Sequence, residues 1–215
     1  MVHDGDLREE LVGTAFEMMA NGLSPGRSGN VSTRAGDGIL ITPSGISYDE
    51  LEGDDIVFVG LDGTAASNSR KPSSETGLHL AIYRDRPEAN AIVHCHSPAA
   101  TALACAREPI PAFHYTVAIA GGTSIPLAPY ATFGTDELAQ SVAGALKGVR
   151  ACLMANHGQI AFGANLEKAL SLAEEVETLA QQYLEVLKIG RPNVLDDAEM
   201  QRVLERFKTY GQQPS

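Results

Sequence analysis

Long apolar runs are missing from this sequence of 215 residues. A membrane-spanning helix needs roughly 18 uninterrupted apolar residues, and no stretch of the chain approaches that length. The first residues, Met1-Val2-His3-Asp4-Gly5-Asp6, are acidic and polar, which is unlike a secretory signal peptide. These two absences predict a protein that is neither exported by such a signal nor embedded in a membrane.

Cysteine is also scarce. The chain has three, Cys95, Cys105 and Cys152, and an odd number cannot pair completely within one chain. All three stand in apolar surroundings of the sequence. We therefore expect reduced, mostly buried thiols, and a cytoplasmic location, rather than a disulfide framework.

Positive charge is in short supply. Sixteen Lys and Arg residues face 27 Asp and Glu residues, which leaves a formal net charge of −11 at pH 7. Such a balance argues against a nucleic-acid backbone or an anionic membrane as partner. An anionic substrate would need a local site that overcomes the unfavourable overall field.

The remaining composition, 44% hydrophobic and 20% charged, is that of an ordinary globular protein. We expect one mixed α/β domain over residues 1–215, because the strands are too short and scattered for a simple βαβ series. Helices are predicted over residues 7–22, 98–106, 135–147, 166–189 and 196–210, and another runs to residue 84 from an N-cap at Ser73 or Ser74. Strands are predicted over residues 31–34, 38–42, 55–61, 91–96 and 151–154, with short β-type runs between 110 and 129.

Residues 91–96 (AIVHCH) form a short apolar run that ends in two histidines. Side chains alternate along a strand, so His94 and His96 should project from one face and Cys95 from the other. Two neighbouring imidazoles are half of a metal site. A histidine taken alone is also explained as a packed or surface residue, so the interpretation depends on a third ligand.

His157, 61 residues after His96 and just beyond another apolar run, is the third candidate. Three imidazoles with an open fourth position are typical of a catalytic zinc site, whereas structural sites are closed by four protein ligands. The neighbouring Asn156 and Gly158 are explained equally by a turn.

Three loops rich in small and polar residues could bind a phosphate without Lys or Arg. They are Ser28-Gly29-Asn30, Thr42-Pro43-Ser44-Gly45 and Pro72-Ser73-Ser74-Glu75. Each offers hydroxyl or amide groups and exposed backbone N–H groups, and the third would lie at a helix N-terminus, which favours anions. Taken separately, each loop is also explained by turn or capping chemistry.

Glu75 is a candidate for moving protons. Glu75 stabilises the helix dipole as a first-turn acid, or it acts as a carboxylate beside the metal. Tyr115, like Tyr130, is by default an amphipathic packing residue. The residues alone leave these alternatives open.

Five motifs occur along the chain in a fixed order: Ser-Gly-Asn, Thr-Pro-Ser-Gly, Ser-Ser-Glu, His-x-His and Asn-His-Gly. In this order and at these intervals they resemble the class II aldolase and adducin family. Residues 111–138 (PAFHYTVAIAGGTSIPLAPYATFGTDEL) and 207–211 (FKTYG) are similar to aldolases of that family. The resemblance extends over nearly the whole chain, from about residue 7 to residue 211.

The resemblance implies a central, largely antiparallel sheet flanked by helices, and a cytoplasmic homotetramer with active sites between subunits. It also implies one Zn²⁺ (or another divalent metal) per subunit, held by His94, His96 and His157. Glu75 matches the catalytic carboxylate, Tyr115 a tyrosine that reaches the site from the neighbouring subunit, and Phe133 an aromatic wall. The residues that match the phosphate-binding loops are Gly29, Asn30, Ser44, Gly45, Ser73 and Ser74.

The implied reaction is the reversible cleavage of a phosphorylated ketose to dihydroxyacetone phosphate and a short aldehyde. The ketose is L-fuculose 1-phosphate or a similar sugar, such as 5-deoxy- or 5-methylthio-ribulose 1-phosphate. One alternative is a pentulose-phosphate 4-epimerase, although residues 114–134 follow the aldolase form. A second is a non-enzymatic adducin-type scaffold, against which the retained histidines and Glu75 argue.

Overall fold

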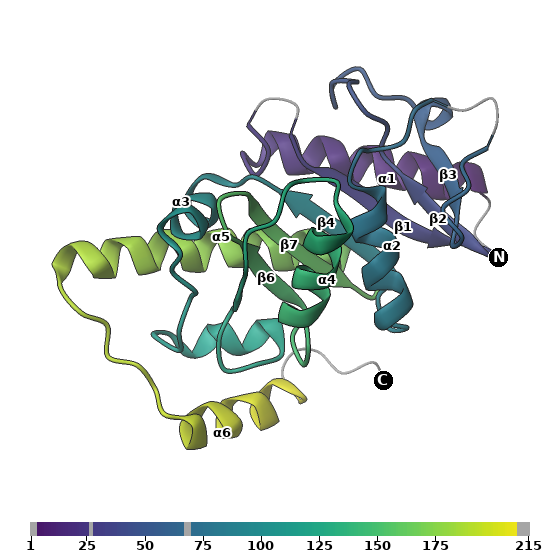
Figure 1. Ribbon diagram of the computed structural model, residues 1–215. Coiled ribbons are helices and arrows are strands. Elements are labelled where there is room, and N and C mark those ends of the chain that lie inside the picture. Colours follow the sequence, from purple (N-terminus) through teal and green to yellow (C-terminus); the bar gives the residue numbers. More distant parts are fainter. Residues whose placement is uncertain (1–3, 26–27, 67–69, 210–215) are drawn as a thin grey trace.

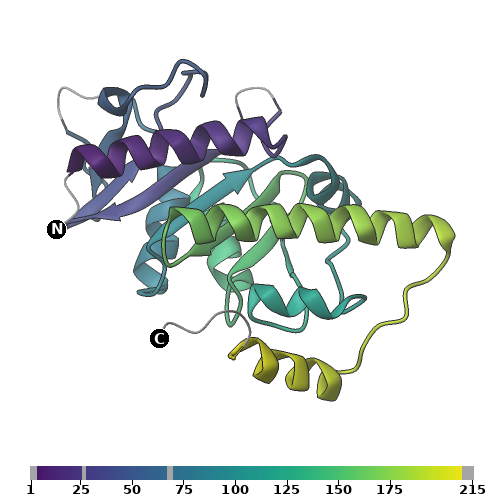
Figure 2. The same ribbon diagram turned by 180° about the vertical axis from the view of Figure 1, so that it is seen from behind.

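In the computed structural model, which describes residues 4–25, 28–66 and 70–209, a seven-stranded sheet lies between two layers of helices (Figures 1 and 2). The strands are β1 (Asn30–Ala35), β2 (Gly38–Ile41), β3 (Val57–Gly60), β4 (Ala91–Cys95), β5 (Leu127–Ala128), β6 (Ala151–Met154) and β7 (Gly158–Gly163). The α-helices are α1 (Asp4–Ala20), α2 (Thr76–Asp85), α3 (Pro98–Ala106), α4 (Asp136–Ala145), α5 (Leu166–Ile189) and α6 (Asp197–Phe207). Two 3₁₀ helices, η1 (Gly53–Asp55) and η2 (Tyr115–Ala120), complete the set in the described residues.

The sheet is largely antiparallel, as predicted. Its strand order is β3-β2-β1-β4-β7-β6-β5, and within it β5 and β6 are the parallel pair. Strand β4 lies in the middle, between β1 and β7. His94 stands opposite Asn30 on one side and Ile160 on the other, so the histidine strand is held along both edges.

Each face of the sheet packs on its own hydrophobic core. Val93 and Cys95 of β4 belong to a core shared with α1, α3 and α5, and Figure 2 shows α1 and α5 across this face. Ile92 points to the opposite core, which α2 and α4 cover (Figure 1). Because side chains alternate along the strand, His94 lies on the face of α2.

The end of β4 is fixed by a contact between helices. Glu177, on the long helix α5, is 5% exposed and accepts hydrogen bonds from the backbone N–H groups of Ala99 and Ala100 at 2.8 and 2.9 Å. These are first-turn donors of α3, which have no partner inside that helix. The carboxylate therefore anchors α3 directly after the His-x-His segment.

Several element boundaries differ from the predictions. Helix α2 begins at Thr76 with Glu75 as its N-cap, so the predicted cap at Ser73 or Ser74 is wrong. The Ser73 hydroxyl instead accepts from the backbone N–H of Glu75, inside the turn that precedes the helix. Asp55 belongs to η1 rather than to the following strand, because its carboxylate accepts from the backbone N–H of Glu52.

Two segments were missed by periodicity. Strand β7 is buried at every position, so it shows no alternation of apolar and polar residues. Within the predicted β-type run, residues 115–120 form η2, where the His114 ring accepts from the backbone N–H of Thr116.

The helix predicted to end at Tyr210 ends at Phe207, and Tyr210 lies outside the described residues. No helix in the described ranges combines the length and apolar character needed to cross a bilayer.

Candidate active site

Three histidines converge at the end of the central strand. His94 and His96 come from β4 and the residue beyond it, and His157 comes from the turn between β6 and β7. Their ring centroids are 4.8 to 5.0 Å apart. One potential ligand atom from each ring lies within 4.8 Å of the others. Residues separated by 61 positions in the sequence thus form one cluster.

His94 is oriented by the neighbouring strand. Its Nδ1 lies 2.8 Å from the carbonyl oxygen of Gln159, which only accepts, so Nδ1 carries the proton. The Gln159 side chain donates to Ser97 and to the carbonyl of Ala173 at 2.8 and 3.0 Å. This arrangement leaves Nε2 of His94 with a free lone pair that faces the cluster, which is the usual preparation of a metal-binding histidine.

His157 is positioned by a tight turn. Asn156 has φ 56°, a left-handed conformation, and its side-chain oxygen accepts from Arg107 Nε at 2.9 Å. At Gly158 a Cβ atom would lie 2.5 Å from the carbonyl oxygen of Cys95, so only glycine allows β7 to approach β4 this closely. The turn predicted around His157 is therefore present, and it delivers the third imidazole.

Glu75 places a carboxylate against the histidines. Its Oε2 lies 3.0 Å from His94 Nε2 and accepts from Asn30 Nδ2 at 3.0 Å. Its Oε1 lies 3.3 Å from His157 Nε2, is buried, and makes no hydrogen bond. A buried carboxylate oxygen without a hydrogen bond indicates a group that the protein alone does not supply.

The electrostatics of the cluster favour an ionised Glu75 and neutral rings at His96 and His157. Burial alone would raise the pKa of Glu75, but the adjacent His94 and His157 and the hydrogen bond from Asn30 outweigh burial and hold that pKa well below its ordinary value. Burial, followed by the charge of His94, lowers the pKa of His96 and of His157 to about 4. Neutral imidazole is the form that binds metals.

The donor set fits a divalent metal ion. Two nitrogens bound to one tetrahedral zinc at roughly 2.0–2.1 Å are about 3.3 Å apart, and the Nε2 atoms of His94 and His96 are separated by 3.2 Å. Three imidazoles leave a coordination position open, and Glu75 borders it. The geometry shows a potential metal site formed by three imidazoles.

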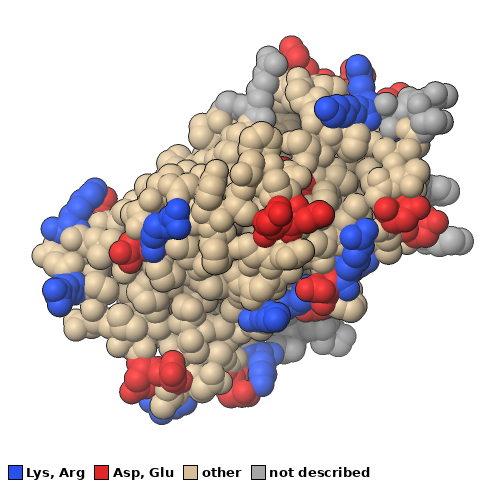
Figure 3. Space-filling view, viewed as in Figure 1, with Lys and Arg blue, Asp and Glu red and all other residues tan. Residues whose placement is uncertain are grey.

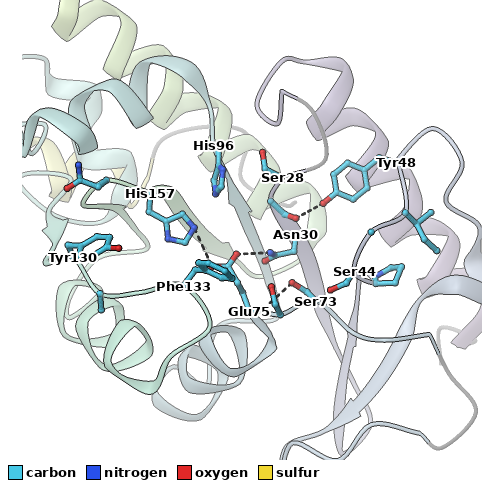
Figure 4. Close-up of a pocket in the computed structure, with 17 residues that line it drawn as sticks. Ser28, Asn30, Ser44, Tyr48, Ser73, Glu75, His96, Tyr130, Phe133 and His157 are labelled. Atoms are coloured by element: carbon cyan, nitrogen blue, oxygen red, sulfur yellow. Dashed lines mark hydrogen bonds and ion pairs between the residues drawn. The ribbon is translucent and has the colours of Figure 1, made fainter.

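A cavity of about 400 Å³ opens beside the cluster. Figure 4 shows Tyr130, Phe133 and His157 on one side of it, and Asn30, Ser44, Tyr48 and Ser73 on the other. The sequence-predicted residues that line the cavity are Gly29, Asn30, Ser44, Gly45, Ser73, Ser74, Glu75, Phe133, His96 and His157. The structure thus brings all three predicted phosphate loops to one place, although phosphate binding itself stays a prediction.

Among the described residues that line the cavity, none is Lys or Arg. On the face drawn in Figure 3, basic side chains are scattered singly or in small groups between acidic ones. The cavity's polar groups are instead hydroxyls, amides and backbone N–H groups of the three loops. An anion there would be bound by neutral donors, as the sequence suggested.

Tyr115 lies elsewhere. It begins η2, is 54% exposed, and lines a different cavity together with Ile119 and Phe207. Its predicted arrival in the site of a neighbouring subunit stays a prediction. The tail Gln212-Gln213-Pro214-Ser215 and Arg27 lie outside the described residues.

Some site residues were missed or misread in the sequence. Tyr48 lines the cavity and its hydroxyl donates to the carbonyl oxygen of Gly29 at 2.6 Å, yet no motif marks it. Tyr130, interpreted as a packing residue, is 56% exposed and lines the cavity. Its position directly after Pro129, in the loop between β5 and α4, was the available signal, since functional residues are often found on loops.

Comparisons with known proteins agree with this geometry. A family model described as Class II Aldolase and Adducin N-terminal domain matches residues 9–184. A 5-methylthioribulose-1-phosphate/5-deoxyribulose-1-phosphate aldolase from Rhodospirillum rubrum is 51% identical over 205 residues, which cover 95% of this chain and 92% of that protein. An L-fuculose phosphate aldolase from Escherichia coli K12 is 53% identical over 207 residues, covering 95% of each. The solved structure of an L-fuculose 1-phosphate aldolase has a TM-score of 0.91 and 42% identity, covering 94% of this chain and 96% of that one.

Proposed function

The chain belongs to the class II aldolase and adducin family and is an aldolase within it, and on that premise we propose that it reversibly cleaves a ketose 1-phosphate to dihydroxyacetone phosphate and a short aldehyde. The observation that carries the proposal is the Glu75 carboxylate, with one oxygen free of hydrogen bonds, set between His94 and His157. A scaffold protein would have no need of a buried carboxylate held in this way.

His94, His96 and His157 hold the metal in this proposal, and Zn²⁺ is the ion we expect because three imidazoles with an open position suit it. When bound, the ion acts as a Lewis acid that stabilises negative charge on the substrate oxygens as the carbon–carbon bond breaks. No Schiff-base lysine is required. The protein's part is to fix the rings, which Gln159 does for His94 and the turn at Asn156 does for His157.

Glu75 moves the proton in this reaction. Breaking the C3–C4 bond leaves an electron pair on C3, and a carboxylate beside the metal site can exchange a proton between that carbon and solvent. Its lowered pKa keeps the group ionised when no substrate is present, so it starts as the base that removes the proton from C3 in the condensation direction. In cleavage it passes to C3 a proton taken up from solvent. General acid–base transfer of this kind contributes roughly 10²–10⁴-fold.

The three loops orient the substrate by its phosphate. Gly29, Ser44, Gly45, Ser73 and Ser74 line the same cavity as Glu75, and two of the loops also contact each other. The Ser44 backbone N–H donates to the carbonyl of Lys71 at 2.9 Å, and the Ser44 hydroxyl donates to that of Pro72 at 2.9 Å. A phosphate bound there places the reacting carbons near the histidines, which accelerates the reaction by orientation.

The aldehyde half of the substrate meets Tyr130 and Phe133, and Tyr115 of a neighbouring subunit in a homotetramer. Tyr115 exchanges a proton with the aldehyde oxygen in this scheme. The large exposed fraction of its side chain, 54%, leaves it available to another chain. Relatives named for different sugar phosphates share about half of this sequence. A methyl or thioether difference in an apolar pocket changes selectivity by only about 1–3 kcal/mol.

The test is a coupled assay for dihydroxyacetone phosphate on metal-loaded protein. The panel contains L-fuculose 1-phosphate, L-rhamnulose 1-phosphate, 5-deoxy-ribulose 1-phosphate, 5-methylthioribulose 1-phosphate and L-ribulose 5-phosphate. We expect release from at least one 1-phosphate, abolished by a chelator and restored by Zn²⁺. Absence of release from every 1-phosphate with metal bound contradicts the proposal, and interconversion of L-ribulose 5-phosphate without release would identify an epimerase.

A further inference from the structure

A second histidine system lies behind the active site, and the proposed reaction does not use it. His79, on the sheet-facing side of α2, is 0% exposed among the apolar residues of that helix. Its immediate polar neighbours, Ser32 on β1 and Tyr83 on α2, are 0% and 2% exposed. A buried polar cluster of this kind is stable only when every member is hydrogen-bonded.

The cluster forms an unbroken chain of contacts to the carboxylate. Tyr83 Oη lies 2.9 Å from Ser32 Oγ, and Ser32 Oγ lies 2.6 Å from His79 Nδ1. His79 Nε2 lies 2.5 Å from Asn30 Oδ1, and Asn30 Nδ2 donates to Glu75 Oε2 at 3.0 Å. Four residues, two on β1 and two on α2, thus connect the interior of the protein to Glu75, the N-cap of α2.

The direction of every hydrogen bond in this chain follows from the orientation of the Asn30 amide. Its Nδ2 donates to Glu75 Oε2, and its Oδ1 faces His79 Nε2. That oxygen only accepts, so His79 must carry its proton on Nε2. Burial, followed by the charge of His94, lowers the pKa of His79 to about 3, so the ring is neutral and its Nδ1 accepts from Ser32.

The Ser32 hydroxyl has then used its proton, and its oxygen accepts from Tyr83. The four hydrogen bonds therefore run one way, from Tyr83 to the carboxylate. Bonds aligned in this way polarise one another. If His79 carried its proton on Nδ1 instead, Asn30 would face a ring lone pair with its oxygen and would rotate its amide.

We propose that His79 is a positioning residue for the reaction at Glu75, because its Nε2–H holds the Asn30 amide with the NH₂ group toward the carboxylate. The inference rests on the proposed function, since it assigns a role to that carboxylate. With the amide reversed, two oxygens would face each other across the contact of 3.0 Å. The carboxylate would then be displaced from this contact.

A pair of matched substitutions separates this role from simple packing. In His79→Gln the amide nitrogen can reach the position of Nε2 and keep the donor to Asn30. In His79→Asn the side chain is one methylene shorter, so its amide reaches only the position of Nδ1. Both introduce a buried amide, and thermal unfolding of the two variants measures the structural cost that they share.

We expect His79→Asn to lower kcat by about 10- to 100-fold, the usual effect of removing a hydrogen-bonding partner behind a reacting group. KM should change less than kcat, because the His79 ring contacts only one of the three predicted phosphate loops, through Asn30, and its two nitrogens bond to Asn30 and Ser32 rather than to the Ser44 and Ser73 loops. His79→Gln should recover kcat to within about 3-fold of the wild type. Equal losses in the two variants, or no loss in either, would overturn the proposal.

A second measurement needs neither substrate nor metal, and no variant that must fold. Nitrogen-15 spectra of the wild-type protein labelled at histidine report which ring nitrogen of His79 carries the proton. The signals of His79 are those that remain once the signals of the other histidines are assigned. We expect the neutral Nε2–H form at pH 7. The Nδ1–H form, or a doubly protonated ring, in protein that is active would overturn this inference and leave the aldolase proposal intact.

Failure of the proposed function has a different signature. If the wild-type protein cleaves none of the sugars in the panel, the role of His79 in that reaction falls together with the proposal, whatever the tautomer. If the wild type is active, the Gln and Asn variants and the spectra decide on His79 alone.

Discussion

Glu75 and Tyr115, the two side chains proposed to move protons, have very different surroundings. Glu75 is 6% exposed, and its carboxylate contacts Asn30, His94 and His157. Tyr115 is 54% exposed, and its ring stacks on that of His114 with centroids 4.8 Å apart. The carboxylate is fixed by its own chain, whereas the tyrosine borders a different cavity from the one beside the histidines.

This difference divides the proposed active site into two parts. One chain builds the metal ligands, the carboxylate and the phosphate loops, so changes there should act within each chain. In the proposal, the tyrosine completes a site by meeting another chain. Variants of the two parts should therefore behave differently when subunits are mixed.

The largest effect is expected from His94→Ala. This buried ring is held by Gln159 and faces the other two histidines, so its loss should remove both the bound metal and measurable activity. Metal content of the purified variant, by elemental analysis, and the dihydroxyacetone phosphate assay check the two parts. A variant that retains a full equivalent of metal would contradict the assigned ligand set.

The matched control for this variant is Cys95→Ala. Cys95 is the next residue of β4 and is also fully buried, but its side chain belongs to the core on the other face of the sheet. It should keep its metal and its activity, with a modest loss of thermal stability. Loss of metal in both variants would mean that the strand, rather than the ring, is responsible.

Glu75→Gln should separate chemistry from metal binding. The amide retains the size of the side chain but cannot act as a base, so we expect the metal to stay bound while kcat falls by about 10³-fold. Steady-state kinetics and metal analysis on the same preparation measure both. An unchanged kcat would remove Glu75 from the mechanism.

Tyr115→Phe should lower kcat by about 10²-fold, the lower end of the range for proton transfer. Thermal stability should be little changed, because the side chain is largely exposed. If the tyrosine serves a neighbouring subunit, co-expression with Glu75→Gln should restore activity. In random assemblies about a quarter of the sites would then contain an intact carboxylate and an intact tyrosine.

The control for this mixing experiment is co-expression of Glu75→Gln with His94→Ala. Both changes lie in the part that one chain builds, so no site in such a mixture is intact. Recovery of activity in the mixture of Glu75→Gln with Tyr115→Phe, and not in this control mixture, would establish the division of the site. Recovery in neither mixture would place Tyr115 in the site of its own chain or outside the reaction.

The parts of the site that could be predicted from the sequence are those formed by residues close together in the chain. The alternation along β4 correctly placed His94 and Cys95 on opposite faces of the sheet, and the small-residue loops were visible as motifs. Pairing of β4 with β7 was not visible, because β7 is buried at every position and shows no alternation. Its first residue, Gly158, had been interpreted only as part of a turn.

His79 and Tyr48 were missed for a different reason. His79 bonds to Asn30 across 49 positions, and Tyr48 bonds to Gly29 across 19. Nothing in the sequence around either residue marks it, since each acts through a partner that a distant segment supplies. Polar networks behind a site can therefore be recognised only when the positions of distant segments in the folded sheet are known.

The smallest effect is expected at Asn156, where backbone and side chain can be tested separately. Its left-handed backbone suits glycine, whereas its side chain bonds to Arg107 and borders the cavity beside His157. Asn156→Gly should keep the turn, with a change of stability within about 1 kcal/mol and a severalfold loss of kcat. Asn156→Ala loses the same polar group, but alanine tolerates the left-handed conformation less well than either glycine or asparagine. The strain should cost about 1–3 kcal/mol of stability. Thermal unfolding should thus separate the two variants. Equal melting temperatures would show that the left-handed conformation at residue 156 places no demand on the residue there.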